Sequence, residues 1–86
     1  NFHLSVYCDR RYIRLKATRI YSSNQIEKYR VEGKNRSIVL QSNRPVLLAH
    51  GLKHRRTDWK LVEGSLSNSY LLSEIISALE RCIKRS

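Results

Sequence analysis

Two histidines and the arginines beside them are the residues whose types and spacing could do chemistry. His50 and His54 lie four residues apart, and Arg55 and Arg56 follow directly. A histidine can act as a general acid or base while arginines hold a phosphate, so this set would suit a small ribonuclease, such as a toxin. The alternative is an exposed loop whose histidines do no chemistry, and the sequence favours that alternative.

Metal and cofactor chemistry finds little support, and we expect neither a catalytic residue nor a metal site. Gly51 separates the two histidines, and no acidic or cysteine ligand lies close to them in the sequence, whereas a structural zinc ion takes four ligands. The seven acidic residues are scattered, without the close pair that glycoside or two-metal hydrolysis needs. Only three glycines occur, each at a turn, so a phosphate-binding glycine loop is absent.

The positive charge of the chain is concentrated in its first sixty residues. The net charge is +10, and residues 1–60 hold fourteen Lys or Arg against four acids, while residues 61–86 hold three of each. Such a field attracts phosphate backbones, anionic membranes or acidic proteins, although it also keeps a protein soluble by self-repulsion. We predict nucleic-acid contacts from the cations Arg10, Arg11, Arg14, Lys16, Arg19, Lys53, Arg55 and Arg56.

Tyrosines are interspersed with the first of these cations. Tyr12 and Tyr21 are candidates for stacking on bases, and Tyr7 lies in the same region. Rings among cations are typical of a platform for single-stranded nucleic acid, where each stacked base contributes roughly 1 to 3 kcal/mol. These tyrosines fit equally well at the edge of a core with a solvated hydroxyl. Trp59 alternates with Leu61 and is expected to anchor the core.

In most of the segments that carry these residues, apolar and polar side chains alternate with the period of a β-strand. Alternation predicts strands over roughly 2–8, 11–20, 25–32, 36–41 and 57–63. In the second strand Ile20 falls on the polar parity, so we expect a bulge or a strand end near Thr18. The letters "EGKNR" between the third and fourth strands predict a hairpin loop.

The remainder of the chain predicts one irregular segment and one helix. Residues 46–56 are expected to be short and irregular or extended, with a single helical turn as the alternative. A helix over roughly 68–84 follows from apolar residues three and four apart, with Asn68 or Ser69 as its cap. The apolar stripe consists of Leu72, Ile75, Ile76, Leu79 and Ile83.

These elements predict an α+β fold in a single domain, residues 1–86. Four or five antiparallel strands would form a meander or a partly open barrel, with the C-terminal helix packed on one face. The length of 86 residues leaves room for one core. No apolar run approaches the roughly 20 residues of a membrane span, so we expect no membrane insertion. Cys8 and Cys82 are expected to be reduced thiols, which favours a cytoplasmic protein.

Residues 37–80 resemble a group of short, uncharacterised bacterial proteins. The shared words are "QSNRP", "GLKHR" and "WKLVEG", followed by a helix of the type "YLLSEIISALE". The resemblance implies a small bacterial domain, and it implies no activity and no functional residue.

The leading hypothesis is therefore a small basic module that binds DNA or RNA through the phosphate backbone without catalysis. The alternative is a protein interaction domain, either for an acidic partner or for self-association through an exposed sheet edge. The ribonuclease is the third hypothesis. No cofactor is expected in any of the three.

Overall fold

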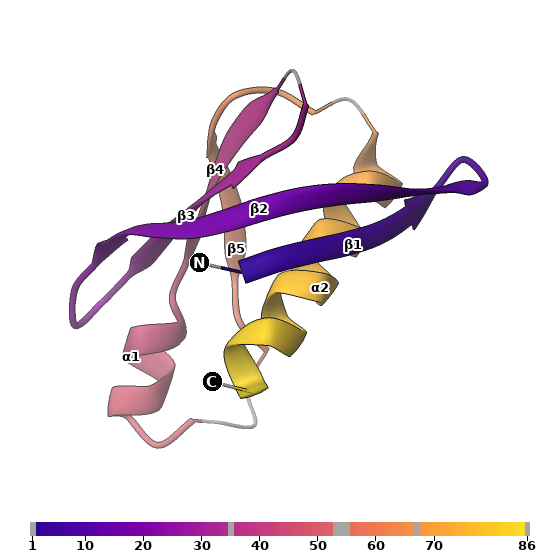
Figure 1. The fold of residues 1–86 in the computed structure, drawn as a ribbon. Helices are drawn as coiled ribbons and strands as arrows, with labels where there is room; N and C mark the ends of the chain where they lie inside the picture. The colour runs from indigo at the N-terminus through magenta and orange to yellow at the C-terminus, as the bar shows by residue number, and fades with distance from the viewer. Residues whose placement is uncertain (1, 35, 53–55, 67, 86) are drawn as a thin grey trace.

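The computed structural model describes residues 2–34, 36–52, 56–66 and 68–85, which form a five-stranded sheet with a long helix across one face (Figure 1). The sheet is open and antiparallel, in the order β1-β2-β3-β4-β5. This confirms the predicted α+β meander with a C-terminal helix. The elements are β1 (Phe2–Cys8), β2 (Arg11–Ser22), β3 (Glu27–Glu32), β4 (Ser37–Ser42), α1 (Arg44–Ala49), β5 (Trp59–Glu63) and α2 (Ser69–Arg85).

Short turns join the first four strands, so each strand pairs with its neighbour in sequence. Asp9 and Arg10 have φ angles of 54° and 65°, as a two-residue hairpin turn of the right twist requires. The predicted "EGKNR" hairpin closes with a hydrogen bond of 2.8 Å from the Gly33 amide to the Arg36 carbonyl. The register shifts between Arg19 and Tyr21, which confirms a bulge one or two residues beyond the expected position.

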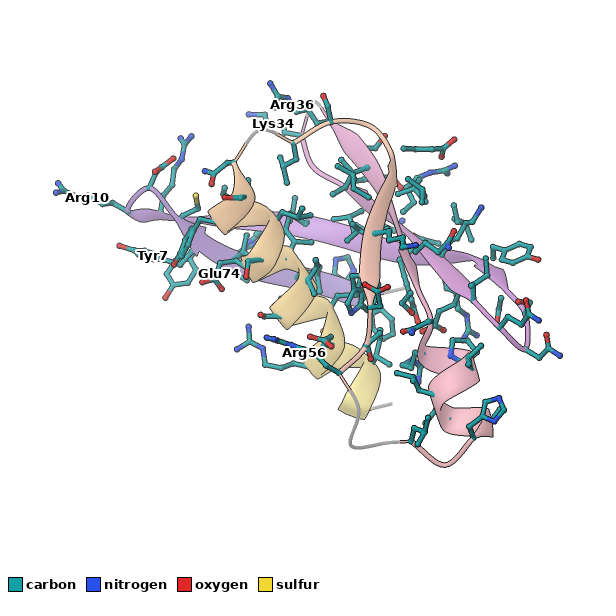
Figure 2. All side chains as sticks on the ribbon, turned by 180° about the vertical axis from the view of Figure 1, so that it is seen from behind. Tyr7, Arg10, Lys34, Arg36, Arg56 and Glu74 are labelled. Atoms are coloured by element: carbon teal, nitrogen blue, oxygen red, sulfur yellow. The ribbon has the colours of Figure 1, made fainter. Side chains whose placement is uncertain are left out.

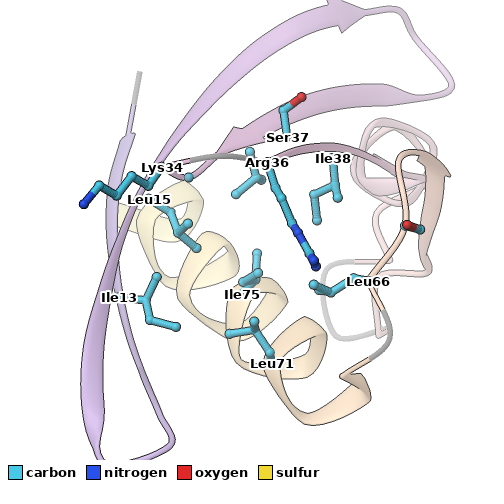
Figure 3. A pocket seen from close by; sticks show the side chains of 12 residues that line it. Ile13, Leu15, Lys34, Arg36, Ser37, Ile38, Leu66, Leu71 and Ile75 are labelled. Carbon is cyan, nitrogen blue, oxygen red and sulfur yellow. The ribbon is translucent and has the colours of Figure 1, made fainter.

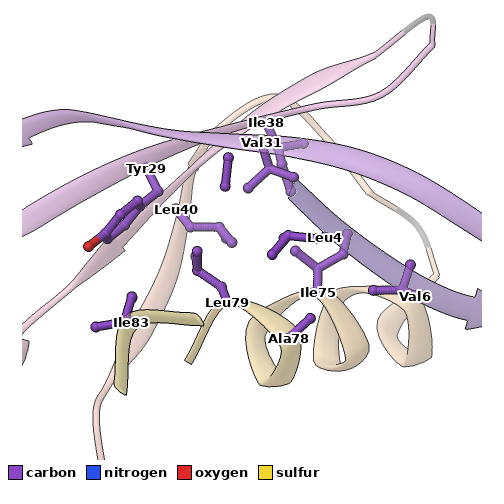
Figure 4. Packing of buried hydrophobic residues seen from close by; sticks show 11 residues of the cluster. Leu4, Val6, Tyr29, Val31, Ile38, Leu40, Ile75, Ala78, Leu79 and Ile83 are labelled. Atoms are coloured by element: carbon purple, nitrogen blue, oxygen red, sulfur yellow. The ribbon is translucent and has the colours of Figure 1, made fainter. Parts of the chain in front are cut away.

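The core lies between one face of the sheet and α2 (Figure 4). Alternate residues of every strand face α2, because side chains on a strand alternate between the two faces. In the first four strands these include Leu4, Ala17, Val31 and Leu40, all at most 3 % exposed. Trp59 of β5 packs partly buried against this cluster, as predicted, and its ring lies 6.0 Å from that of Tyr29.

Helix α2 has the apolar stripe that its sequence predicts. The Asn68 side-chain oxygen accepts a hydrogen bond of 3.1 Å from the Leu71 amide, which confirms Asn68 as the cap. Ile75, Leu79 and Ile83 are buried, and Ala78 joins them in the core. Neither helix, over the residues described, has the length and apolarity to cross a lipid bilayer.

The expectation of an irregular or extended segment after β4 was wrong, because residues 44–49 form the helix α1. Pro45 stands in its first turn, where its fixed φ favours a helix and its missing amide hydrogen costs nothing. At the other end Gly51 has a φ of 68°. The amides of Gly51 and Leu52 donate to the carbonyls of Leu48 and Leu47 at 3.2 and 2.7 Å, the pattern of a Schellman cap.

An ion pair between the partly exposed Arg44 and the buried Glu27 joins α1 to the sheet. The Arg44 guanidinium donates to the two carboxylate oxygens of Glu27, from Nε at 2.6 Å and from Nη2 at 3.0 Å. Glu27 is 1 % exposed and faces the core side of β3 beside Tyr29. Burial, followed by the charge of Glu27, raises the pKa of the Tyr29 hydroxyl. The contact ties the first residue of α1 to a strand that lies seventeen positions earlier in the chain.

The element boundaries differ from the predicted ones by two residues or fewer. β2 continues to Ser22, β3 begins at Glu27, and β5 begins at Trp59 rather than residue 57. Both cysteines are free in the structure, and Cys8 is buried. His54 lies outside the described residues, so the pairing of His50 with His54 belongs to the sequence alone.

Candidate nucleic-acid interface on the open face of the sheet

The face of the sheet opposite α2 carries no helix in the part of the chain that the structure describes. In Figure 1, α2 lies behind the sheet, so the face of β1, β2 and β3 that is turned to the viewer is this one. We call it the open face. Side chains directly opposite each other in an antiparallel pair point to the same face, so the strand register defines its members.

Cations from three strands share the open face. Arg14 is opposite Ser5, and Lys16 is opposite both His3 and Glu32. Arg30 is opposite Thr18, and Lys28 pairs with Gln41, which in turn pairs with Lys60. Adjacent strands lie about 4.8 Å apart, and same-face residues of one strand about 6.7 Å apart. The open-face cations, Arg14, Lys16, Lys28, Arg30 and Lys60, therefore form a grid across β2, β3 and β5.

Three exposed tyrosines accompany these cations. Tyr7 and Tyr12 are opposite each other at the hairpin end of β1 and β2, with ring centroids 5.0 Å apart in an edge-to-face arrangement. Tyr12 is 72 % exposed, and Tyr7 and Tyr21 are each 50 % exposed. Lys28 Nζ lies 5.5 Å from the centre of the Tyr21 ring, within the range of a cation–π contact. The rings thus flank the cations at both ends of β2.

The open-face cations are free of carboxylate partners among the residues described. The ion pair that the structure shows joins Arg44 to Glu27, away from this face. The open face contains the acids Glu32 and Glu63, at its β3 and β5 positions, so its net charge stays positive. Unpaired cations can bind a phosphate without first breaking an internal ion pair. They also repel one another, and a bound anion would relieve this repulsion.

The predicted binding residues are distributed over several parts of the molecule. Arg14 and Lys16 lie on the open face. Arg10 occupies the tip of the β1–β2 hairpin (Figure 2), and Arg11 follows it opposite Cys8. Arg19 is opposite Tyr29 and so has the parity of the core side. The predicted stacking residues Tyr12 and Tyr21 both lie with the open-face cations.

Arg56 lies beside α2, on the other side of the sheet (Figure 2). It lines a shallow groove with Trp59, Leu72 and Ile76, so the structure does not bring it to Arg14 and Lys16. Lys53 and Arg55 lie outside the described residues. Arg56 and the cations of β2 therefore belong to different faces of the sheet.

The sequence analysis did not predict that Lys28, Arg30 and Lys60 belong to the same surface. The sequence does show that Lys28 and Arg30 share one face of their strand, since they alternate with Tyr29 and Val31. The missing information was the register, which turns alternation along each strand into one shared face across several strands.

No group of three or more His, Cys, Asp or Glu side chains that could hold a metal ion occurs among the described residues. His50 is exposed at the C-terminal end of α1. No protein-family model, curated protein or solved structure matches the chain, so its own geometry carries the functional argument.

Proposed function

We propose that this protein binds single-stranded nucleic acid on the open face of its sheet, without catalysis. The observation that supports this most is the grid of unpaired cations from three strands, flanked by exposed tyrosines, on a face that no described helix covers. Phosphates provide most of the affinity of such a surface, and unstacked bases can lie on the rings.

Each part of the open face has a role in this proposal. Arg14 and Arg30 each offer a planar fork that can hold two phosphate oxygens at once, whereas Lys16, Lys28 and Lys60 contribute as point charges. Tyr12, the most exposed of the rings, stacks on a base at the hairpin end. A duplex hides its base faces from such rings, which is why the proposal is for a single strand.

The proposal includes a cytoplasmic location and leaves DNA and RNA as equal ligands. Cys8 and Cys82 are both free thiols, and reduced thiols persist in that compartment. The contacts invoked are to phosphates and base faces, which the two nucleic acids share.

Removing two open-face arginines is expected to flatten the salt dependence of binding. For a single strand, log K falls with log salt by about 0.7 per neutralised phosphate. Arg14→Gln combined with Arg30→Gln should therefore reduce the slope by about 1.4. Titration of a fluorescent, unstructured oligonucleotide at several salt concentrations measures this slope.

A matched control removes the same charge from the other side of the molecule. Arg36 and Arg56 are both exposed and line hollows together with residues of α2, and Arg36→Gln with Arg56→Gln should leave the slope near that of the unmodified protein. Equal losses in both double variants would show that net charge alone attracts the ligand, and the open face would lose its role. Sedimentation as a stable dimer without oligonucleotide affinity would favour the protein interaction domain instead.

A further inference from the structure

A cavity of about 260 Å³ opens between the sheet and the first turns of α2 (Figure 3). Its walls are mainly apolar and come from four separate segments. They include Ile13 and Leu15 of β2, Ile38 of β4, Leu66 before α2, and Leu71 and Ile75 of α2. The cavity is on the core side of the sheet and is therefore distinct from the open face.

The cavity exists because α2 covers the core side of the sheet unevenly. α2 lies closest to β1, so the helix leaves Ile13 and Leu15 of β2 partly exposed. Gly33 forms part of the same wall, where an added Cβ would lie 3.1 Å from the Leu15 side chain. A larger residue at position 33 would occupy this space.

Arg36 brings a positive charge to this apolar site. Its side chain extends from the β3–β4 hairpin across the cavity toward Leu66 (Figure 3). It forms no side-chain hydrogen bond or ion pair with any residue in the described ranges. The guanidinium therefore lies over apolar walls without an anionic partner among the described residues. A carboxylate would suit it, because a carboxylate accepts two parallel hydrogen bonds from a guanidinium. Lys34 adds a second cation at the rim.

We propose that this cavity binds a medium-chain carboxylate, with the tail between sheet and helix and the carboxylate on Arg36. Apolar walls with one charged group match a ligand that has an apolar tail and a single anionic end. A methylene group is close in size to a water molecule, which takes about 30 Å³. The cavity thus holds a tail of about eight carbons, and octanoate is the probe of choice.

The size of the cavity also argues against a larger occupant. Ligand pockets commonly range from about 300 to 1,000 Å³, so this one is at the small end. A peptide segment or a two-chain lipid would leave most of its apolar surface outside. The proposal does not depend on nucleic-acid binding, because its residues and those of the open face lie on opposite sides of the sheet.

Methyl NMR of the full chain, titrated with sodium octanoate, tests this proposal. We expect shifts of the Leu15, Leu71 and Ile75 methyl signals, and affinity that rises about fourfold per methylene from hexanoate to octanoate. Octylammonium, with the same tail and the opposite charge, should bind at least about tenfold more weakly. Arg36→Gln should weaken octanoate binding by a similar factor, whereas Arg10→Gln, which removes an exposed arginine at the tip of the β1–β2 hairpin, should leave it unchanged.

Three results would overturn the proposal. The first is an absence of methyl shifts at millimolar octanoate in protein that remains folded. The second is equal affinity for octanoate and octylammonium, which would reduce the site to an unspecific apolar hollow. The third is an equal loss from Arg36→Gln and Arg10→Gln, which would mean that the overall charge attracts the anion.

Discussion

Arg44→Met is expected to lower the free energy of unfolding by about 3 kcal/mol, because it leaves the carboxylate of Glu27 buried without its partner. Glu27 is 1 % exposed, and both of its oxygens accept hydrogen bonds from Arg44. The Ser42 hydroxyl also donates to Glu27, but at 3.4 Å this hydrogen bond is long and compensates little of the charge. Urea denaturation followed by circular dichroism measures the loss.

Two further variants separate the charge from the volume of the side chain. Glu27→Gln with Arg44→Met removes both charges, and its loss should be smaller than that of Arg44→Met alone. Arg19→Met, at an exposed position of β2, should change stability by less than about 0.5 kcal/mol. If Arg44→Met costs no more than Arg19→Met, then the ion pair does not hold α1 to β3 in the way described.

The second large effect is expected at Gly64, directly after β5. Gly64 has a φ of 83°, and an added Cβ would lie 2.7 Å from the Ser37 carbonyl oxygen and 3.0 Å from Ile38 Cγ2. Gly64→Ala therefore has two costs. The left-handed backbone conformation costs about 1 to 2 kcal/mol for a residue with a Cβ. The clash with the backbone of β4 adds about 1 kcal/mol or more, since overpacking generally costs about 1 to 3 kcal/mol. We expect a total of about 3 kcal/mol in the same denaturation assay.

Gly51→Ala provides the matched control for this prediction. Gly51 has a similar φ of 68°, but nothing lies within 4 Å of its added Cβ. Its cost should therefore be the strain alone, about 1 kcal/mol. Equal losses at the two positions would contradict the close approach of Gly64 to β4.

The sequence predicted those parts of the fold that local patterns determine. Alternation in β2 and the slip at Ile20 predicted both the strand and its bulge, and the helical stripe with Asn68 predicted α2 and its cap. The sequence patterns did not predict α1, because its ion-pair partner Glu27 lies far away in the sequence, on β3. Even so, Pro45 and Gly51 stand at the two positions that favour the start and end of a short helix.

The candidate site was harder to predict because a surface depends on register and layer order. Arg14 and Lys16 were identified from the polar side of one strand, together with Tyr12. Adding Lys28 and Arg30 required knowing which residues of β2 and β3 are opposite each other. Arg56 is close to other cations in sequence, yet the chain passes to the α2 side of the sheet before β5 begins.

Mapping of the bound ligand by NMR is the most direct test of the open face as a nucleic-acid interface. An unstructured thymidine oligonucleotide is titrated at low salt into isotope-labelled protein, and backbone and side-chain signals are followed. We predict the largest shifts at Tyr12, Arg14 and Arg30, with little change along α2. Shifts that concentrate at Arg56 and α2, or no shifts at any residue, would contradict the account.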